Sequence, residues 1–269
     1  MILKLDLKQN IQLALSDSIH KTILVCSHER SGTHFLMNSI AKNSNYSVEP
    51  YLNYDSKPFG GIINFFDRTE VKSNLMKLIS FSINNKKYNL ASIIKSHHPP
   101  HHFEELFGNE QLIFLYIYRS PLDTLVSFWK FIERWDHHEG PKGLSCLDFI
   151  NAKPEGQMMR YQFKTYDTIF DRWANHVLAW YKISLIYKNV IIINYDDLIN
   201  SYEKIITDLL KNIGIPVKFV YPPDRDKYFK GANIKISNQE ISKINEYIIK
   251  NLFRYPELLK IYPKFSIAL

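Results

Sequence analysis

The chain has 269 residues and a formal net charge of +7 at pH 7, and 45% of its residues are hydrophobic. Aromatic residues make up 14% of the chain, which excludes an intrinsically disordered composition and is enough for a substantial core. A basic balance is typical of proteins with anionic partners, such as nucleic acid, an acidic membrane or a polyanionic small molecule. A charge of this size is equally typical of ordinary solubility, so both interpretations stay open.

Only two cysteines occur, Cys26 and Cys146, and they lie far apart in the sequence. This count argues against a disulfide framework and favours a reducing compartment. Residues 1–20 carry charges throughout and lack the apolar core of a signal peptide. No apolar stretch of about 18 residues occurs, so the sequence predicts no transmembrane segment and a cytoplasmic location.

Alternating strand and helix patterns run along the chain. Apolar runs with β-branched or aromatic bias predict strands at 22–27, 91–95, 111–118 and 189–194. These runs are continuously apolar, which is typical of strands covered on both faces in a parallel sheet. Helical patterns lie at 32–42, 121–134, 168–187, 197–213 and 237–252. The sequence therefore predicts an α/β fold with a central parallel β-sheet flanked by helices.

Two of these helices have clear start signals. Ser120 and Pro121 stand at the cap and the first turn of one helix. Ser237 begins another, with Glu240 three residues later in a capping-box pattern.

Two segments rich in turn-forming residues, 43–75 and 135–166, predict long excursions from the sheet. Such loops often serve as lids or binding loops. Neither a repeat nor a clear linker divides the chain, so we expect a single domain over residues 1–269.

The first predicted strand leads into Arg30-Ser31-Gly32-Thr33 and then a helix. The first N–H groups of a helix are unpaired and lie at its positive end, so this position favours anions. Gly32 lets the backbone approach a phosphate, and the neighbouring side chains add donors. The nucleotide triphosphatase signature with its loop lysine is absent, which disfavours an ordinary ATPase. The alternative is a plain strand-to-helix turn.

A second anion-binding element follows the third predicted strand. Arg119 stands at the carboxyl end of that strand, where open α/β sheets bind ligands. Ser127 lies about two helical turns further on and can face the same crevice. A lone arginine at a strand end is often a surface salt bridge instead. Two such elements at neighbouring strand ends favour the binding interpretation.

These motifs resemble those of the PAPS-dependent sulfotransferases, whose donor is adenosine with a 3′-phosphate and a 5′-phosphosulfate. The segment 29–35, ERSGTHF, is similar to the family's P-K-S-G-T-T-W loop, which grips the 5′-phosphosulfate. The segment 119–127, RSPLDTLVS, is similar to the R-N-P-x-D-x-x-V-S element, which grips the 3′-phosphate. The segment 95–99, KSHHP, is similar to the K-T-H-x-P element, which carries the catalytic histidine.

Three further segments follow the family's order. They are 173–180 (WANHVLAW), 194–198 (NYDDL) and 229–235 (FKGANIK), and they resemble the W-x-x-H-x-x-x-W helix, the Y-E-D-L element and the closing R-K-G segment.

The resemblance implies a P-loop-like sulfotransferase architecture, with PAPS as co-substrate, PAP as product and no metal. The donor-binding residues that it implies are Arg30, Ser31, Gly32, Thr33, His34, Phe35, Arg119, Ser127, Tyr195, Lys230 and Gly231. Four positions depart from the family's pattern, since Arg30 replaces lysine, His34 threonine, Phe35 tryptophan and Phe229 arginine. Tyr195 fits an adenine contact and simple packing equally well.

Three residues are predicted to carry the chemistry. Sulfuryl transfer resembles phosphoryl transfer, in which a group passes between two oxygens and the leaving phosphate gains charge. Arg30 and Lys95 are expected to stabilise the transferred group and the leaving phosphate. His97 is the predicted base, because histidine titrates near neutral pH. From composition alone, the run HHPPHH at 97–102 also fits a surface loop or a metal site.

Other polar and aromatic residues in these segments have structural interpretations. Trp173, His176 and Trp180 share one helical face, which predicts packing in the core. Asp196 and Asp197 are expected at a helix start, where acidic side chains are favourable.

The predicted function is transfer of the sulfuryl group from PAPS to a hydroxyl or amine of a small-molecule, glycan or lipid acceptor. Two alternatives remain, a P-loop kinase or NTPase that uses ATP and Mg²⁺, and a non-catalytic protein that binds PAP or nucleic acid. The chain lacks a basic run interleaved with aromatic residues, which disfavours nucleic acid. Aromatic side chains in the two excursions, such as Tyr51 and Trp135, are expected to shape the acceptor pocket.

Overall fold

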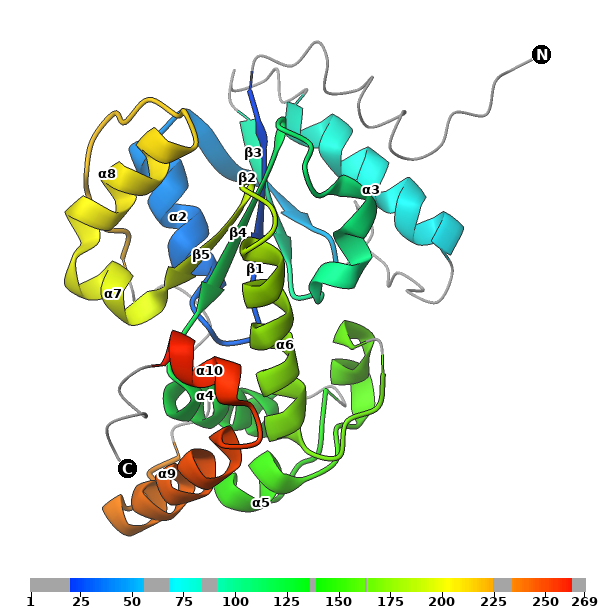
Figure 1. Ribbon diagram of the computed structural model, residues 1–269, viewed down its shortest axis with the longest axis vertical. Coiled ribbons are helices and arrows are strands. Elements are labelled where there is room, and N and C mark those ends of the chain that lie inside the picture. The colour runs from blue at the N-terminus through cyan, green and yellow to red at the C-terminus, as the bar shows by residue number, and fades with distance from the viewer. Residues whose placement is uncertain are drawn as a thin grey trace.

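The computed structural model describes residues 20–55, 68–83, 91–135, 139–162, 164–224 and 234–262. Its centre is a five-stranded parallel sheet with the strand order β2-β3-β1-β4-β5. The strands are β1 (Thr22–Cys26), β2 (Tyr46–Asn53), β3 (Ala91–Ser96), β4 (Leu112–Tyr118) and β5 (Val190–Asn194). Helices lie on both sides of this sheet (Figure 1).

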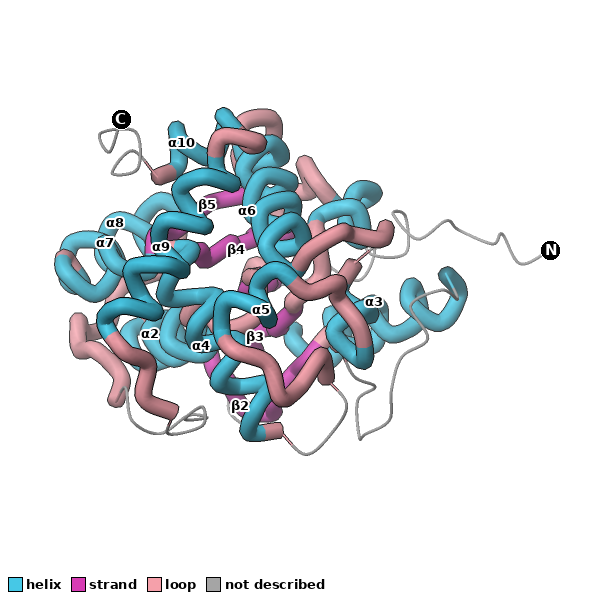
Figure 2. The backbone as a smooth tube through the Cα atoms, turned by 90° about the horizontal axis from the view of Figure 1, so that it is seen from below, coloured by secondary structure: helices cyan, strands magenta, loops and turns pink. Residues whose placement is uncertain are grey.

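The helices form two groups. Those beside the sheet are α2 (Thr33–Asn43), α3 (Arg68–Ile83), α6 (Ile169–Ser184), α7 (Tyr195–Asn200) and α8 (Tyr202–Asn212). Those gathered below it, seen in front in Figure 2, include α4 (Pro121–Arg134), α5 (Cys146–Asn151) and α9 (Asn238–Leu252). The helix α10 (Pro256–Ile261) and the 3₁₀ segments η1 (Pro100–Leu106) and η2 (Gly156–Tyr161) complete the described elements.

Successive residues of the central strand β1 face opposite sides of the sheet. Ile23 and Val25 pack into the core beneath α2 and α8, and Leu24 and Cys26 pack into the core beneath α3 and α6. All four side chains are fully buried. A strand covered on both faces explains the continuous apolar runs, and the parallel sheet flanked by helices is confirmed.

The four predicted strands are confirmed, but the expectation of a long excursion over 43–75 is wrong for β2 and for the start of α3. This strand contains Pro50 and polar residues, which hide it from a search for apolar runs. It lies at the edge of the sheet, where a proline is tolerated because one side of the strand has no ladder to complete. Its pairing with β3 also shifts register between Ser47 and Leu52.

The single helix expected over 197–213 is two helices, α7 and α8. Ser201 ends the first and begins the second with φ −132° and ψ 44°, a non-helical backbone. The Ser201 side chain makes no capping hydrogen bond, so the break lies in the backbone conformation of this residue. The other excursion, 135–166, likewise contains two short elements, α5 and η2.

The predicted start signals are confirmed. The helix α4 has the expected bounds, and Ser120 Oγ accepts a hydrogen bond from the N–H of Asp123 at 3.2 Å. Ser237 Oγ accepts from the N–H of Glu240 at the same distance. These caps fix where α4 and α9 leave the loops that precede them.

The aromatic face of α6 lies in the core, as predicted. Trp173 and Trp180 are fully buried, and His176 is 3% exposed. The Trp180 ring stacks on Tyr116 of β4 with the ring centroids 5.3 Å apart.

Both cysteines are buried free thiols. Among the residues placed by the structure, no helix has the length and apolarity needed to cross a bilayer.

Candidate active site

A cavity of about 400 Å³ lies where the loops after β1, β3 and β4 meet. Parallel strands end at one edge of the sheet, so residues far apart in the sequence gather there. The cavity is lined by Glu29, Arg30, Gly32, Thr33, His34, Phe35, Asn38, Tyr51, Asn53, Lys95, His97, Arg119, Ser127, Phe128, Phe131, Trp135, Glu139, Arg160, Tyr161, Tyr195, Pro223 and Asp224.

The loop after β1 brings the start of α2 to this cavity. Gly32 caps α2 with φ +102°, and no side chain caps the helix in its place. A Cβ at Gly32 would lie 2.3 Å from Cδ2 of Tyr195, so both the backbone angle and the close ring require glycine. The hydroxyl of Thr33 forms a hydrogen bond with that of Ser27, with Oγ1 and Oγ 2.6 Å apart. The helix therefore presents its first N–H groups without a side-chain cap at Gly32, an arrangement that favours an anion.

Arg30 and Arg119 reach the same cavity from two loops. Arg30 Nε donates to Ser127 Oγ at 3.2 Å, and its guanidinium lies 5.4 Å from the Phe131 ring centroid. The guanidinium of Arg119 lies 4.9 Å from the Tyr195 ring centroid. Burial and the charge of Arg119 lower the pKa of Arg30. An anion bound beside the two guanidinium groups would relieve this repulsion.

Arg119 also has the contact expected of a surface residue. Its Nη2 lies 3.7 Å from Oδ2 of Asp123, and both side chains are partly exposed. An exposed pair at this distance contributes little to stability. Arg119 therefore lines the cavity and also forms a weak ion pair with Asp123. Both interpretations from the sequence, ligand binding and a surface salt bridge, apply to this residue.

Asp55, just beyond β2, organises the end of β3. Its Oδ2 accepts from Lys95 Nζ at 3.0 Å, and its Oδ1 accepts from the N–H of His97 at 3.2 Å. Ser96 Oγ donates to the same Oδ1 at 3.4 Å. Asp55 and Lys95 are both buried. One carboxylate therefore fixes the positions of the two residues that the sequence assigns to catalysis at this strand.

The contacts of His97 determine its tautomer. Its Nδ1 lies 3.0 Å from the carbonyl oxygen of Ser27, which can only accept, and 3.2 Å from Ser27 Oγ, which can also accept, so we assign the proton to Nδ1. Burial of the ring, and after it the charge of Lys95, lowers the pKa of His97 to about 3. The ring is then neutral at pH 7 and Nε2 keeps a lone pair, but this pKa is well below the near-neutral value on which the sequence prediction of a base rested. Because His97 lines the cavity, it can act there as a proton acceptor.

The run around His97 is not a surface loop. His98 is fully buried, and the 3₁₀ segment η1 begins at Pro100. The carbonyl of His97 accepts from His176 Nε2 at 3.0 Å, and the carbonyl of His98 accepts from Trp180 Nε1 at 3.2 Å. In the ranges that the structure describes, no group of three or more His, Cys, Asp or Glu side chains is arranged to hold a metal ion.

Aromatic side chains form further walls. The rings of His34 and Tyr51 stack with centroids 5.8 Å apart and planes 16° apart. Phe35 and Tyr195 meet edge to face at 5.8 Å. Burial, followed by the charges of Lys95 and Arg30, lowers the pKa of His34 to about 4. These rings flank the loop after β1, and Tyr195 both packs and lines the cavity.

Most of the residues predicted from the sequence meet at this cavity. Those that line it are Arg30, Gly32, Thr33, His34, Phe35, Lys95, His97, Arg119, Ser127 and Tyr195. Ser31 is 1% exposed and does not line the cavity. Lys230 and Gly231 lie outside the described residues, as does Phe229.

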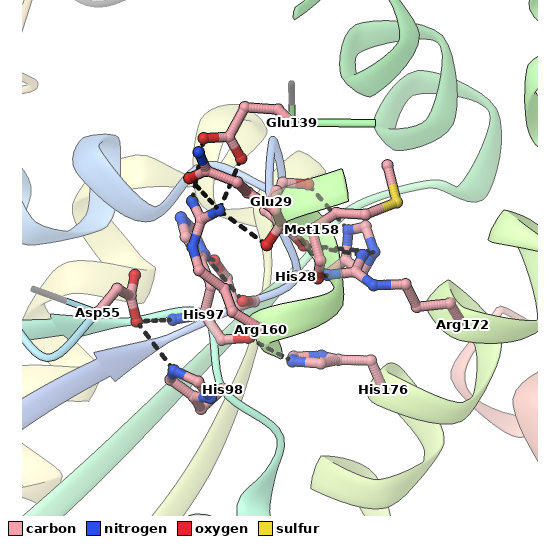
Figure 3. Close-up of polar contacts among 12 residues, drawn as sticks. His28, Glu29, Asp55, His97, His98, Glu139, Met158, Arg160, Arg172 and His176 are labelled. Atoms are coloured by element: carbon pink, nitrogen blue, oxygen red, sulfur yellow. Dashed lines mark hydrogen bonds and ion pairs between the residues drawn. The ribbon is translucent and has the colours of Figure 1, made fainter. Parts of the chain in front are cut away.

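Several residues of the site gave no signal that the sequence reasoning used. Glu29 and Arg172 form a buried ion pair with Nη2 and Oε1 2.7 Å apart, shown in Figure 3. Glu139 and Arg160 form a second pair at 2.8 Å, at the wall of the cavity. The available signal for the first pair was Arg172 itself, a charged residue between Asp171 and Trp173 on a helix predicted to pack in the core. Burial alone would raise the pKa of Glu29, but Arg172 and His28 hold it below the usual range of a carboxyl.

The parallel sheet, with a helix N-terminus and two arginines at its carboxyl edge, defines an α/β protein with a cavity whose charge favours an anion. The family model of the sulfotransferase domain matches residues 20–252, and the chain belongs to this family.

A curated relative is the 3-alpha-hydroxysteroid sulfotransferase of Cavia porcellus, which is 24% identical over 147 residues. The match covers 55% of this chain and 46% of that relative, so the chain spans less than half of the relative's length.

Solved sulfotransferases share the fold. The one from Alicyclobacillus acidocaldarius has a TM-score of 0.57 and 12% identity, with 90% of this chain and 96% of that chain covered. Mouse sulfotransferase SULT7A1, solved as a complex with PAP, has a TM-score of 0.45 and 17% identity, with coverages of 89% and 68%. The first of these likenesses extends over nearly the whole of both chains and supports the fold.

The buried histidines predict how stability depends on pH. Burial lowers the pKa of His28 to about 4 and holds the pKa values of His98 and His176 well below the usual value of 6.5. Below pH 6.5 the unfolded chain therefore binds more protons than the folded one. The free energy of unfolding should stay level from pH 8 to 7 and fall as the pH drops from about 6.5 to about 4. Glu29, whose pKa is also lowered, adds to the fall below about pH 4.5.

Urea unfolding followed by tryptophan fluorescence at pH 7.5, 6.5, 5.5 and 4.5 measures this dependence. The variant His176→Gln should show a shallower fall, because one buried titrating ring is gone. Equal unfolding free energies at pH 7.5 and 4.5 would contradict the assignment of neutral buried histidines.

Proposed function

We propose that the protein transfers a sulfuryl group from PAPS to a hydroxyl or amine of an acceptor. The observation that carries this proposal is the meeting of Arg30, Arg119 and the neutral ring of His97 at one cavity. Two permanent cations suit a donor with an anionic group at each end, and a lone-pair nitrogen suits removal of the acceptor's proton. Membership of the sulfotransferase family supports the same reaction.

The 5′-phosphosulfate would be held by the loop after β1. Arg30 and the N–H groups at the start of α2 supply donors, with Thr33 beside them. Ser31 is buried, and its N–H donates to the carbonyl oxygen of His28 at 3.4 Å, so a donor-binding role for Ser31 rests on the sequence resemblance. The donor set consists of hydrogen-bond donors and positive charge, which is the chemistry that a phosphosulfate requires.

The 3′-phosphate would be held by the loop after β4. Arg119 offers its guanidinium there, and Ser127 keeps its O–H to donate while its oxygen accepts from Arg30. Tyr195 and Phe35 offer ring faces and edges to the adenine. A role for Lys230 and Gly231 in closing over the 3′-phosphate rests on the sequence resemblance.

In the proposed reaction, the acceptor oxygen or nitrogen forms a bond to sulfur while the bond from sulfur to the 5′-phosphate oxygen breaks. The proton of the acceptor passes to Nε2 of His97, and PAP leaves with an added negative charge. Arg30 and the α2 amides stabilise that charge but cannot protonate it, since an arginine stays charged. Lys95 uses one N–H for Asp55 and would use another for the transferred group.

The proposed acceptor is a small-molecule, glycan or lipid compound with a free hydroxyl or amine. The cavity wall beyond the donor loops contains Phe128, Phe131, Trp135 and Tyr161, which suit an apolar ring or the face of a sugar. Three further statements remain predictions from the sequence. They are the single domain over residues 1–269, catalysis without a metal, and a cytoplasmic location.

Calorimetric titration of PAP without added metal tests the donor site. We expect Arg119→Ala to weaken PAP binding at least about tenfold, because the 3′-phosphate loses a charged hydrogen-bond partner. Arg254→Ala removes the same charge at an exposed residue outside the cavity and should bind PAP like the wild type. Failure of the wild type to bind PAP, together with binding of ATP and Mg²⁺, would favour a kinase instead.

Sulfuryl transfer from labelled PAPS tests the proposed base. After an acceptor is found in a panel of phenols, alcohols, sugars and amines, His97→Ala should lower kcat by about 10²- to 10⁴-fold. Its Kd for PAP should change little, because the role assigned to the ring is toward the acceptor. His101→Ala lies in the same histidine-rich run but outside the cavity lining, and it should keep wild-type activity. Wild-type turnover by His97→Ala would exclude the histidine as the base.

A further inference from the structure

One residue of α6 holds two consecutive residues of the loop after β1. Arg172 donates from Nη2 and Nη1 to the two carboxylate oxygens of Glu29, at 2.7 and 3.1 Å. Its Nη1 also donates to His28 Nε2 at 2.7 Å. His28 Nδ1 donates in turn to the carbonyl oxygen of Glu29 at 3.0 Å, so one neutral tautomer of His28 satisfies both contacts (Figure 3).

These contacts are shielded from water. Arg172 is 1% exposed, Glu29 is 7% exposed and His28 is fully buried. Nη2 of Arg172 also donates to the carbonyl oxygen of Met158 at 3.3 Å. A planar fork with these fixed directions holds its partners in one arrangement, which an exposed and flexible pair would not do.

The two residues that Arg172 holds, His28 and Glu29, immediately precede Arg30, which reaches into the cavity. Arg30 has φ +66°, a left-handed conformation that is unfavourable for a residue with a Cβ. Such a conformation persists where the surroundings fix the chain on either side. The held side chains of His28 and Glu29 fix it on one side, and Gly32 packed beneath Tyr195 fixes it on the other. The Arg30 side chain then leaves the loop toward Ser127.

We propose that Arg172 is a positioning residue for the anion-binding loop. By holding His28 and Glu29, it sets the direction from which Arg30 reaches the donor. Arg172 does not line the cavity, so it acts through the loop and not by contact with the ligand. This inference rests on the proposed function, because it concerns the binding of PAP.

The variant Arg172→Lys separates position from charge. A lysine keeps the positive charge opposite Glu29 but has a single ammonium, which cannot hold the carboxylate and His28 in the geometry of the fork. We expect PAP affinity to fall by about ten- to a hundredfold, since a small misplacement of a contacting group costs this much. An effect of net charge alone would leave the affinity unchanged.

A double-mutant cycle with Arg30→Ala shows whether the effect passes through Arg30. In that background Arg172→Lys should change the Kd for PAP by less than about twofold, because the residue that it positions is gone. A general structural effect would add fully in both backgrounds. If Arg30→Ala binds PAP too weakly to titrate, Arg30→Gln, which also removes the guanidinium and its charge, takes its place in the cycle.

Leu258→Ala is the control for loss of stability. Leu258 is fully buried in α10 and does not line the cavity, so its truncation weakens the fold without touching the loop. All variants are titrated at 10 °C after near-UV circular dichroism shows that they are folded. Leu258→Ala should bind PAP with the wild-type Kd.

A weakened Kd for Arg172→Lys that disappears in the Arg30 background would support the inference. Wild-type affinity of Arg172→Lys, an equal loss in both backgrounds, or an equal loss in Leu258→Ala would overturn the inference alone. Failure of the wild-type protein to bind PAP would overturn the proposed function and this inference with it.

Discussion

The bidentate contact between the Arg172 guanidinium and the Glu29 carboxylate joins the interior of the fold to the loop at the mouth of the site. Burying two charges costs several kcal/mol, and only good geometry with further hydrogen bonds offsets that cost. Here a third contact to His28 completes the arrangement. Loss of one partner would leave an uncompensated buried charge, at a cost of about 3–5 kcal/mol. The loop's position is therefore tied to α6, whose Trp173 and Trp180 lie fully in the core.

A second buried carboxylate acts in a similar way on the neighbouring strand. Asp55 receives Lys95 Nζ and the N–H of His97, so the end of β3 is fixed by a residue that follows β2. The two carboxylates hold the ends of the neighbouring strands β1 and β3, and the arginines and the histidine line the cavity. Groups held in place before the ligand arrives need little reorganisation, which is the condition for electrostatic stabilisation of a developing charge.

The elements that the sequence predicts well are those whose signal is local. The continuous apolar runs identify four of the five strands, and the Ser120-Pro121 cap places the start of α4 at the correct residue. The edge strand β2 is missed because its burial depends on pairing with β3 and not on its own pattern. The site divides in the same way. The local loop motifs predict Arg30 and Arg119 as residues of the cavity. Glu29, Arg172 and Asp55 have partners at least 40 residues away in the chain, and no local pattern reveals such pairs.

A crystal structure of the protein with PAP tests the central claim most directly, because it shows where each phosphate lies. The account predicts the 5′-phosphate against the N–H groups of Gly32 and Thr33 and the Arg30 guanidinium, and the 3′-phosphate against Arg119 and Ser127. Nε2 of His97 should then face the open space beside the 5′-phosphate, where an acceptor would stand. PAP bound away from the loop after β1, or bound there with His97 turned from the cavity, would contradict the account.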